Sequence, residues 1–259
     1  MLNYEHIRYC QNLSFIQRAK EFPVHRKNII RKEVSLSCIL FHHQDSEISS
    51  SSNLSILISI FTQHLNTKAM LKDLILKNRS YRRFYQSERI SKNQLRAWVD
   101  LARNSASARN SQSMKYILST DDDFNNQIFG NLAWAGYLSY WDGPEEGERP
   151  SAYIILLHDT LISGSYLCDD GIAAQSILLG ATEAGFGGCM IYSVNRNKLK
   201  ELLKLSDQYE IIQVIALGKP KETVVLEDVK NGDIKYWRDD NQIHHVPKRS
   251  LDEIILDVK

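Results

Sequence analysis

The stretch from Asp170 to Ser193, DGIAAQSILLGATEAGFGGCMIYS, constrains the fold of this chain more than any other. Its first part is apolar or small on nearly every side, which predicts a helix buried all round rather than one lying on a surface. Three glycines between residues 185 and 188 then end the helix, because glycine readily takes the left-handed conformation of a helix end. Cys189–Ile191 is predicted as a short strand. The junction that follows could present backbone groups to a ligand, although an ordinary core helix and strand have the same pattern.

Composition and charge exclude several classes of protein. Of 259 residues, 43% are hydrophobic and 24% charged, as in ordinary globular proteins, and the net charge of +1 favours neither nucleic acid nor a membrane surface. No apolar run approaches the roughly 20 residues that span a bilayer, and the N-terminus lacks a secretory signal pattern. The four cysteines are far apart, which is typical of reduced thiols. We therefore expect a cytoplasmic protein without a membrane or nucleic-acid partner.

Glycine usage divides the chain into two parts. All twelve glycines fall at or beyond Gly130, and Ser46–Ser55 has the composition of a flexible linker. We predict an N-terminal extension over residues 1–69 and a folded domain over residues 70–259. The extension could be an appendage of unknown role, or the product of a start codon upstream of Met70.

Two polar segments carry candidate ligand-binding groups. Asn78–Phe84, NRSYRRF, holds three arginines and a serine, which suit a phosphate through paired, charge-assisted hydrogen bonds. In the polar loop Ser105–Gln112, the amides of Asn110 and Gln112 offer both donors and acceptors that could bind the polar edge of a ring. A solvated basic turn and an ordinary loop would have the same residues.

The remaining elements are predicted from local signals. Ser91 and Gln94 form a capping box that begins a helix. The other expected elements are a strand over Lys115–Leu118, a helix over Asn131–Tyr140, a surface loop over Trp141–Pro150, a strand over Ala152–His158, a helix over Arg196–Leu205, a strand over Ile211–Leu217, an edge or irregular segment over Glu222–Asp228 and a hairpin turn at Asn231-Gly232. His244 and His245, adjacent in a strand, would face opposite sides, so no metal site is expected.

Five motifs in this order, NRSYRRF, ASARNSQS, EAGFGGCMIYS, ALGKP and VPKRSLDEII, resemble the FMN-dependent nitroreductase family from about Met70 onward. The resemblance implies an α+β fold with a central, mostly antiparallel sheet flanked by helices. It also implies an intertwined homodimer with FMN at the interface, so that two subunits make each pocket. The buried helix of the opening stretch resembles the long helix at the centre of that interface.

The resemblance implies ten cofactor-binding residues. Those matching the motif that holds the flavin phosphate and ribityl chain are Arg79, Ser80 and Arg82, completed by Lys248 and Arg249. Those matching a polar loop supplied by the partner subunit are Ser107, Asn110 and Gln112. Those matching the segment whose backbone faces the flavin ring near N5 are Tyr192 and Ser193. No catalytic acid or base is implied, because the flavin carries the hydride.

The implied activity is an FMN-dependent oxidoreductase that takes hydride from NADH or NADPH and reduces nitroaromatic or quinone acceptors by a ping-pong mechanism. The aromatic residues Trp134, Tyr137, Tyr140 and Trp141 could form a lid over a flat acceptor, or pack in the core.

The polar loop departs from the family pattern at Ala106, Ser113 and Met114, where proline, proline and tryptophan are usual. Two alternatives follow: a flavin-binding protein with weak turnover, or a flavin enzyme of other chemistry such as reductive dehalogenation. A third alternative is an interaction module in which residues 1–69 contact a partner.

Overall fold

The computed structural model describes residues 71–259, in which a five-stranded antiparallel sheet forms the centre. Its strands are β1 (Phe84–Tyr85), β2 (Met114–Ser119), β3 (Ala152–Asp159), β4 (Gly187–Ile191) and β5 (Tyr209–Pro220). β5 pairs with β3 along one side and with β4 and β1 along the other, and β2 pairs with the far side of β3. All eight residues of β3 are buried. The predicted α+β class is confirmed, as are the four strands that were predicted for this sheet, β2, β3, β4 and β5.

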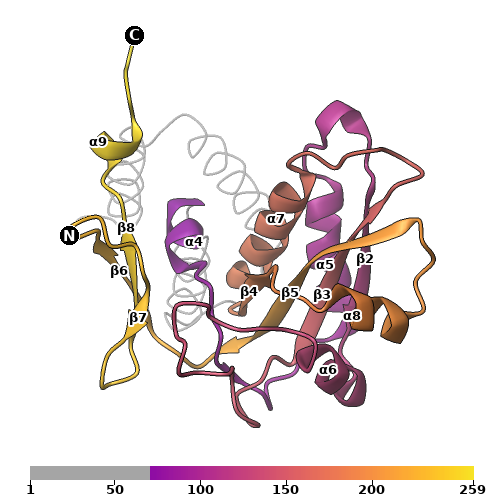
Figure 1. Ribbon diagram of the computed structural model, residues 1–259, viewed down its shortest axis with the longest axis horizontal. Helices are drawn as coiled ribbons and strands as arrows, with labels where there is room; N and C mark the ends of the chain where they lie inside the picture. Colours follow the sequence, from indigo (N-terminus) through magenta and orange to yellow (C-terminus); the bar gives the residue numbers. More distant parts are fainter. Residues whose placement is uncertain (1–70) are drawn as a thin grey trace, which may run out of the picture. The chain divides into compact units, whose positions relative to one another are not determined.

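Helices cover both faces of this sheet (Figure 1). α5 (Lys92–Arg103) and α7 (Asp169–Glu183) pack on one face, where Ile154 of β3 points. α6 (Asp122–Phe129) and α8 (Arg196–Leu203) pack on the other face. Because neighbouring side chains of a strand alternate between faces, β3 contributes to both cores. No helix in the described part of the chain is long and apolar enough to cross a bilayer.

Helix ends follow local chemistry. The predicted capping box is present, with Ser91 and Gln94 bonding reciprocally at the start of α5. Asn195 accepts a hydrogen bond from the backbone N–H of Lys198 at the start of α8. That helix ends at Leu203, two residues before the predicted end, because Lys204 takes a left-handed φ of 51°.

α7 confirms the predicted helix and its glycine stop, but not burial on every side, because Ile172, Gln175 and Leu179 are only partly buried in the single chain. It is buried along most of its length, and it ends in a Schellman arrangement: the N–H of Phe186 donates to the carbonyl of Ala181, and that of Gly185 to the carbonyl of Thr182. Gly185 has a φ of +76°, which only glycine adopts readily. The chain turns directly into β4, so the helix and strand are fixed beside each other.

A separate three-stranded sheet follows β5 (Figure 1). It consists of β6 (Val224–Asp228), β7 (Trp237–Arg238) and β8 (His244–Lys248). β8 lies between the others, parallel to β6 and antiparallel to β7. The predicted edge segment is therefore a true edge strand, β6. The predicted turn has positive φ at both Asn231 and Gly232. Two short helices, α4 (Leu71–Lys77) and α9 (Leu251–Ile254), complete the described residues.

The predicted helix over Asn131–Tyr140 is wrong. The segment forms turns, and its backbone bonds across to another part of the chain: Ala133 donates to the carbonyl of Ser193, and the carbonyl of Asn131 accepts from Asn195. Ala135 has a positive φ of 43°, which a helix does not allow. The aromatic pattern that suggested a helix instead reflects burial of Trp134 and Leu138 against the sheet.

The predicted N-terminal extension, residues 1–69, and its linker lie outside the described residues, so the boundary near Met70 stays a prediction.

Candidate functional site

The arginine-rich segment 78–83 runs beside β4 between α4 and β1. Ser80 forms a parallel bridge with Gly188, and the N–H of Tyr81 donates to the carbonyl of Gly188 at 3.0 Å. A side chain at Gly188 has no room, since a Cβ there would lie 2.4 Å from the carbonyl oxygen of Ala216. This close approach of backbones aligns the segment with the strand and with α7 behind it.

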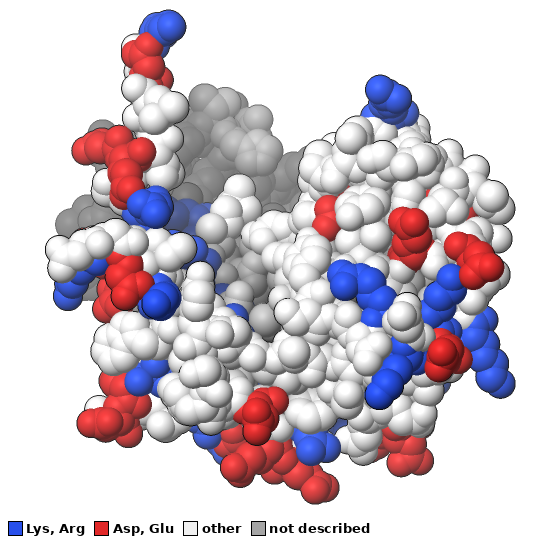
Figure 2. Space-filling view, in the orientation of Figure 1, with Lys and Arg blue, Asp and Glu red and all other residues white. Residues whose placement is uncertain are grey.

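A cavity of about 270 Å³ opens where this segment, α7, β4 and β8 meet. Figure 2 shows the surface hollowed between the part of the molecule that carries α7 and the part that carries β6–β8. The polar wall of the cavity consists of Asn78, Arg79, Ser80, Arg82, Gln175 and Lys248. Four of these residues, from Asn78 to Arg82, lie near the start of the domain in the sequence, whereas Lys248 lies near its end. The fold therefore brings together Arg79, Ser80, Arg82 and Lys248 of the predicted phosphate site.

The three cations of this wall have no ion pair with any carboxylate of residues 71–259. Arg79 donates from Nη2 to the carbonyl of Ile75 at 2.6 Å, while its buried Nε has no partner there. Arg82 donates from Nη1 to the carbonyl of Ser80 at 3.1 Å. Burial lowers the pKa of Arg79, because desolvation disfavours its charged form. Uncompensated guanidinium groups around a cavity are the donors that a phosphate needs.

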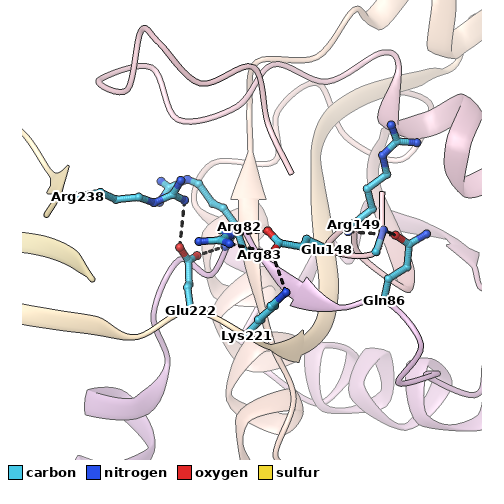
Figure 3. A network of polar contacts seen from close by, with 9 residues as sticks. Arg82, Arg83, Gln86, Glu148, Arg149, Lys221, Glu222 and Arg238 are labelled. Atoms are coloured by element: carbon cyan, nitrogen blue, oxygen red, sulfur yellow. Dashed lines mark hydrogen bonds and ion pairs between the residues drawn. The ribbon is translucent and has the colours of Figure 1, made fainter. Parts of the chain in front are cut away.

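The neighbouring Arg83, by contrast, is already paired. It donates from Nη2 to Glu148 at 2.7 Å, and Lys221 lies 2.8 Å from the same carboxylate (Figure 3). Hydrogen bonding from Arg83, aided by Lys221, lowers the pKa of Glu148 to about 2. Of the three arginines in the motif, only Arg79 and Arg82 are available to an anion.

A buried ion pair contacts the backbone of Arg82. Arg238 of β7 donates to Glu222 at 3.1 Å, with both side chains at most 3% exposed, and Glu222 also accepts the backbone N–H of Arg82 (Figure 3). Arg238 lies over the Trp141 ring, 4.1 Å from its centre. Glu222 therefore joins the arginine-rich segment to the small sheet that carries Lys248.

Arg249, the other half of the predicted basic pair, is not part of the cavity wall. Its Nη1 forms an ion pair with Glu253 one turn along α9. In β8, alternate residues share a face, so Lys248 lies on the side of His244 and Val246. All three line the cavity.

The predicted polar loop also lies apart from this cavity. Ser107 donates to Asp169 at 2.6 Å, and the N–H of Ala108 donates to the same carboxylate at 2.8 Å. Asn110 and Gln112 are exposed, with positive φ values of 54° and 51°. These contacts fix the loop at the start of α7, and within one chain they leave its amides facing solvent.

Tyr192 and Ser193 do not line the cavity either. Tyr192 donates from its hydroxyl to Asp170 at 2.5 Å and accepts from Gln213 at 3.0 Å. Burial and the Asp170 carboxylate raise the pKa of this tyrosine. The carbonyl of Ser193 accepts from Ala133. The bulky Tyr192 thus has a side-chain role in a polar cluster beneath α7.

Sequence reasoning missed the apolar and aromatic part of the wall, which consists of Leu178, Met190, Tyr236, His244 and Val246. Period-two alternation in β8 could have placed His244 and Val246 on the face of Lys248. Tyr236 had no local signal, because its position depends on pairing with the 133–141 segment: its ring lies 4.9 Å from that of Tyr137.

Of the candidate lid aromatics, Trp134 is buried, Trp141 lies under Arg238, and Tyr140 is 73% exposed. Core packing therefore accounts for the two tryptophans. Among the described residues there is no cluster of side chains that could hold a metal ion.

Comparison with known proteins shows which family this chain resembles in sequence and fold. Residues 167–219, which span α7, β4 and most of β5, match the model described as the nitroreductase family. A nitroreductase family protein from Clostridium novyi NT has 28% identity and a TM-score of 0.51, covering 59% of this chain and 88% of its own. The predicted resemblance is confirmed.

Two further structures share the fold. A nitroreductase family protein from Streptococcus pneumoniae TIGR4 has 16% identity and a TM-score of 0.53, covering 73% of this chain and all of its own (100%). A protein described as a nitroreductase, solved in complex with FMN, from Exiguobacterium sibiricum 255-15 has 15% identity and a TM-score of 0.50, covering 60% and 90%. A search of curated proteins found no match.

Proposed function

We propose that this chain, which has the fold of the nitroreductase family and matches the family's model over residues 167–219, is an FMN-dependent oxidoreductase. The observation that carries the proposal is the cavity whose wall holds Arg79, Arg82 and Lys248 without carboxylate partners in the described chain. A doubly charged phosphate would satisfy these groups, whereas a neutral ligand would leave the buried charge of Arg82 unpaired.

The fit of the cavity supports a cofactor bound by its phosphate end. Its volume of about 270 Å³ is at the low end for ligand sites, enough for a phosphate and part of a ribityl chain. Ser80 and Gln175 offer hydroxyl and amide groups to that chain, and Leu178 and Met190 offer apolar contact. We expect the flavin ring to extend beyond this wall.

The rest of the pocket is proposed to come from a second copy of the chain. The loop with Ser107, Asn110 and Gln112 lies outside the cavity of its own chain, as a contribution to the partner's pocket requires. Apolar side chains past β8 are exposed, among them Leu251, Ile254 and Leu256, the last at 96%. An exposed apolar patch of this kind suits an interface in a homodimer.

Bound FMN would supply the chemistry, accepting hydride from NADH or NADPH and passing electrons to a nitroaromatic, quinone or similar flat acceptor. The chain's own part is positional: the cations hold the phosphate, and the hydrogen-bonded backbone around Tyr192 and Ser193 is proposed to lie toward the ring. No side chain is proposed to transfer a proton.

The test is a visible absorption spectrum of the purified full chain, followed by anaerobic addition of NADH and of NADPH. We expect a flavin spectrum that bleaches with one donor and recovers when a nitroaromatic or a quinone is added. Bound flavin that stays oxidised would favour the alternatives of weak turnover or other chemistry. Absence of binding, even with added FMN, would refute the proposal.

The dimer is tested separately by light scattering coupled to gel filtration. We expect the mass of two chains, and of one chain after deletion of residues 251–259. Removal of residues 1–69 should leave dimer and flavin intact; loss of either would favour a partner-binding role for that segment.

A further inference from the structure

His244 lies in the wall of the cavity and has one ring nitrogen that no described residue satisfies. The side chain is fully buried, at 0% exposure. Its Nε2 lies 3.3 Å from Nη1 of Arg82, and its ring centre 5.2 Å from that of Tyr236. Its Nδ1 is buried without a hydrogen-bond partner in the described chain.

The contact with Arg82 fixes which nitrogen carries the proton. A guanidinium group only donates hydrogen bonds, so Nε2 must accept with its lone pair. In the neutral ring the proton then sits on Nδ1, which makes the unpartnered atom a donor. A buried donor without an acceptor destabilises the protein, and an acceptor on a ligand in the cavity would remove that cost.

The surroundings keep this ring neutral. Burial, and then the charges of Arg82, Arg238 and His245, lower the pKa of His244 to about 4. A neutral ring adds a directed donor to the site without adding a fourth positive charge.

We propose that His244 is a further cofactor-positioning residue: it accepts from Arg82, and its Nδ1–H donates to the phosphate of the bound flavin nucleotide. This inference rests on the proposed function. The two bonds leave opposite edges of one rigid ring, so His244 links the Arg82 side chain to the anion and limits the motion of both.

The test compares binding of FMN with binding of riboflavin, which lacks the phosphate. His244→Phe keeps an aromatic ring but removes both nitrogens, and we expect the Kd for FMN to rise about tenfold or more while the Kd for riboflavin is unchanged. His244→Asn keeps an amide near the place of Nδ1 and should recover part of the loss. A merely structural role would weaken both ligands alike.

His158 is the matched control. It lies in β3, is 2% exposed, and also has a buried ring nitrogen without a partner among the described residues, but it does not line the cavity. His158→Phe should therefore leave the Kd for FMN unchanged. Equal Kd values for FMN in His244→Phe and in the wild type would overturn the inference, as would parallel losses for FMN and riboflavin.

A measurement on the unaltered protein guards against variants that do not fold. In ¹⁵N-histidine NMR spectra, the wild type should show the Nδ1–H form of His244, and FMN but not riboflavin should shift that signal. An Nε2–H form, or no shift in FMN-bound protein, would contradict the inference. If the wild type binds no FMN at all, the proposed function is wrong and this inference falls with it.

Discussion

At the scale of single residues, basic side chains of the same chemistry differ in whether a carboxylate already holds them. Lys248 lines the cavity without an ion pair among the described residues, whereas its neighbour Arg249 is paired with Glu253. We expect Lys248→Ala to raise the Kd for FMN about 10–100-fold, the loss of one charge-assisted hydrogen bond. Arg249→Ala should change it little. Titration of flavin fluorescence measures both; equal losses would mean that both residues contact the phosphate.

The sequence predicted the residues that line the cavity only in part, for a physical reason. The motif around Arg79 and Arg82 could be recognised locally, because three arginines close together are unusual in a turn. That Arg83 is used elsewhere depends on Glu148, which is 65 positions away and reaches it only through the fold. His244 was considered only as half of a metal-binding pair with His245, because nothing in the local sequence shows that its ring lies beside Arg82.

At the scale of elements, the packing of α7 against α5 depends on one small residue. A Cβ at Gly180 would lie 2.5 Å from Cδ1 of Leu101 and 3.0 Å from Cδ1 of Trp98. We predict that Gly180→Ala lowers the free energy of unfolding by about 1–3 kcal/mol, measured by urea denaturation.

Gly171, in the first turn of the same helix, is the matched control, since nothing lies within 4 Å of a Cβ there. Gly171→Ala should be neutral or stabilising, because alanine favours helix more than glycine does. Adding Leu101→Ala to Gly180→Ala should restore part of the loss. Equal effects of the two glycine substitutions would refute crowding as the cause.

The link between the small sheet and the arginine-rich segment gives a second prediction at this scale. Glu222→Gln leaves Arg238 buried without a counter-charge, which should cost about 3–5 kcal/mol of stability. Replacing both residues, as in Glu222→Gln with Arg238→Met, should cost less than the single change. The exposed pair of Asp207 and Lys200 provides the control: Asp207→Asn should leave the midpoint of urea denaturation unchanged. If Glu222→Gln left the stability unchanged, Glu222 would not stabilise the contact between the arginine-rich segment and the small sheet.

Elements were predicted well where the pattern is local and poorly where partners lie far away. α7, its glycine stop and the central strands follow from apolar runs and end signals. The segment 131–140 has an equally strong apolar pattern, but its backbone bonds to residues 193–195 rather than within itself. No property of the segment alone distinguishes these two outcomes.

At the scale of the whole molecule, we predict that stability falls in acid in two ranges. His244 has a pKa of about 4 when folded and 6.5 ordinarily, so the unfolded chain binds more protons between these values. Its contribution is complete above pH 6.5 and is lost as the pH falls toward 4. Glu148, with a pKa of about 2 instead of 4.5, acts in the same sense at lower pH. Urea denaturation across this range measures the decline.

His244→Phe removes the first of these titrations. The variant's stability should therefore depend less on pH than that of the wild type between pH 6.5 and 4, while both decline alike below pH 4. Identical slopes in the upper range would mean that His244 titrates normally in the folded protein.

The make-up of the cavity has a consequence for biosynthesis. Its wall combines residues 78–82 with residues 236–248, so the ribosome supplies one side long before the other. A nascent chain arrested before Tyr236 has its first arginines in place but lacks the opposite wall and the central strand of the small sheet. Under the proposed function, capture of a phosphate-bearing ligand must therefore wait until translation has passed Lys248. Such a ligand then stabilises finished chains by mass action and leaves arrested ones exposed to proteolysis.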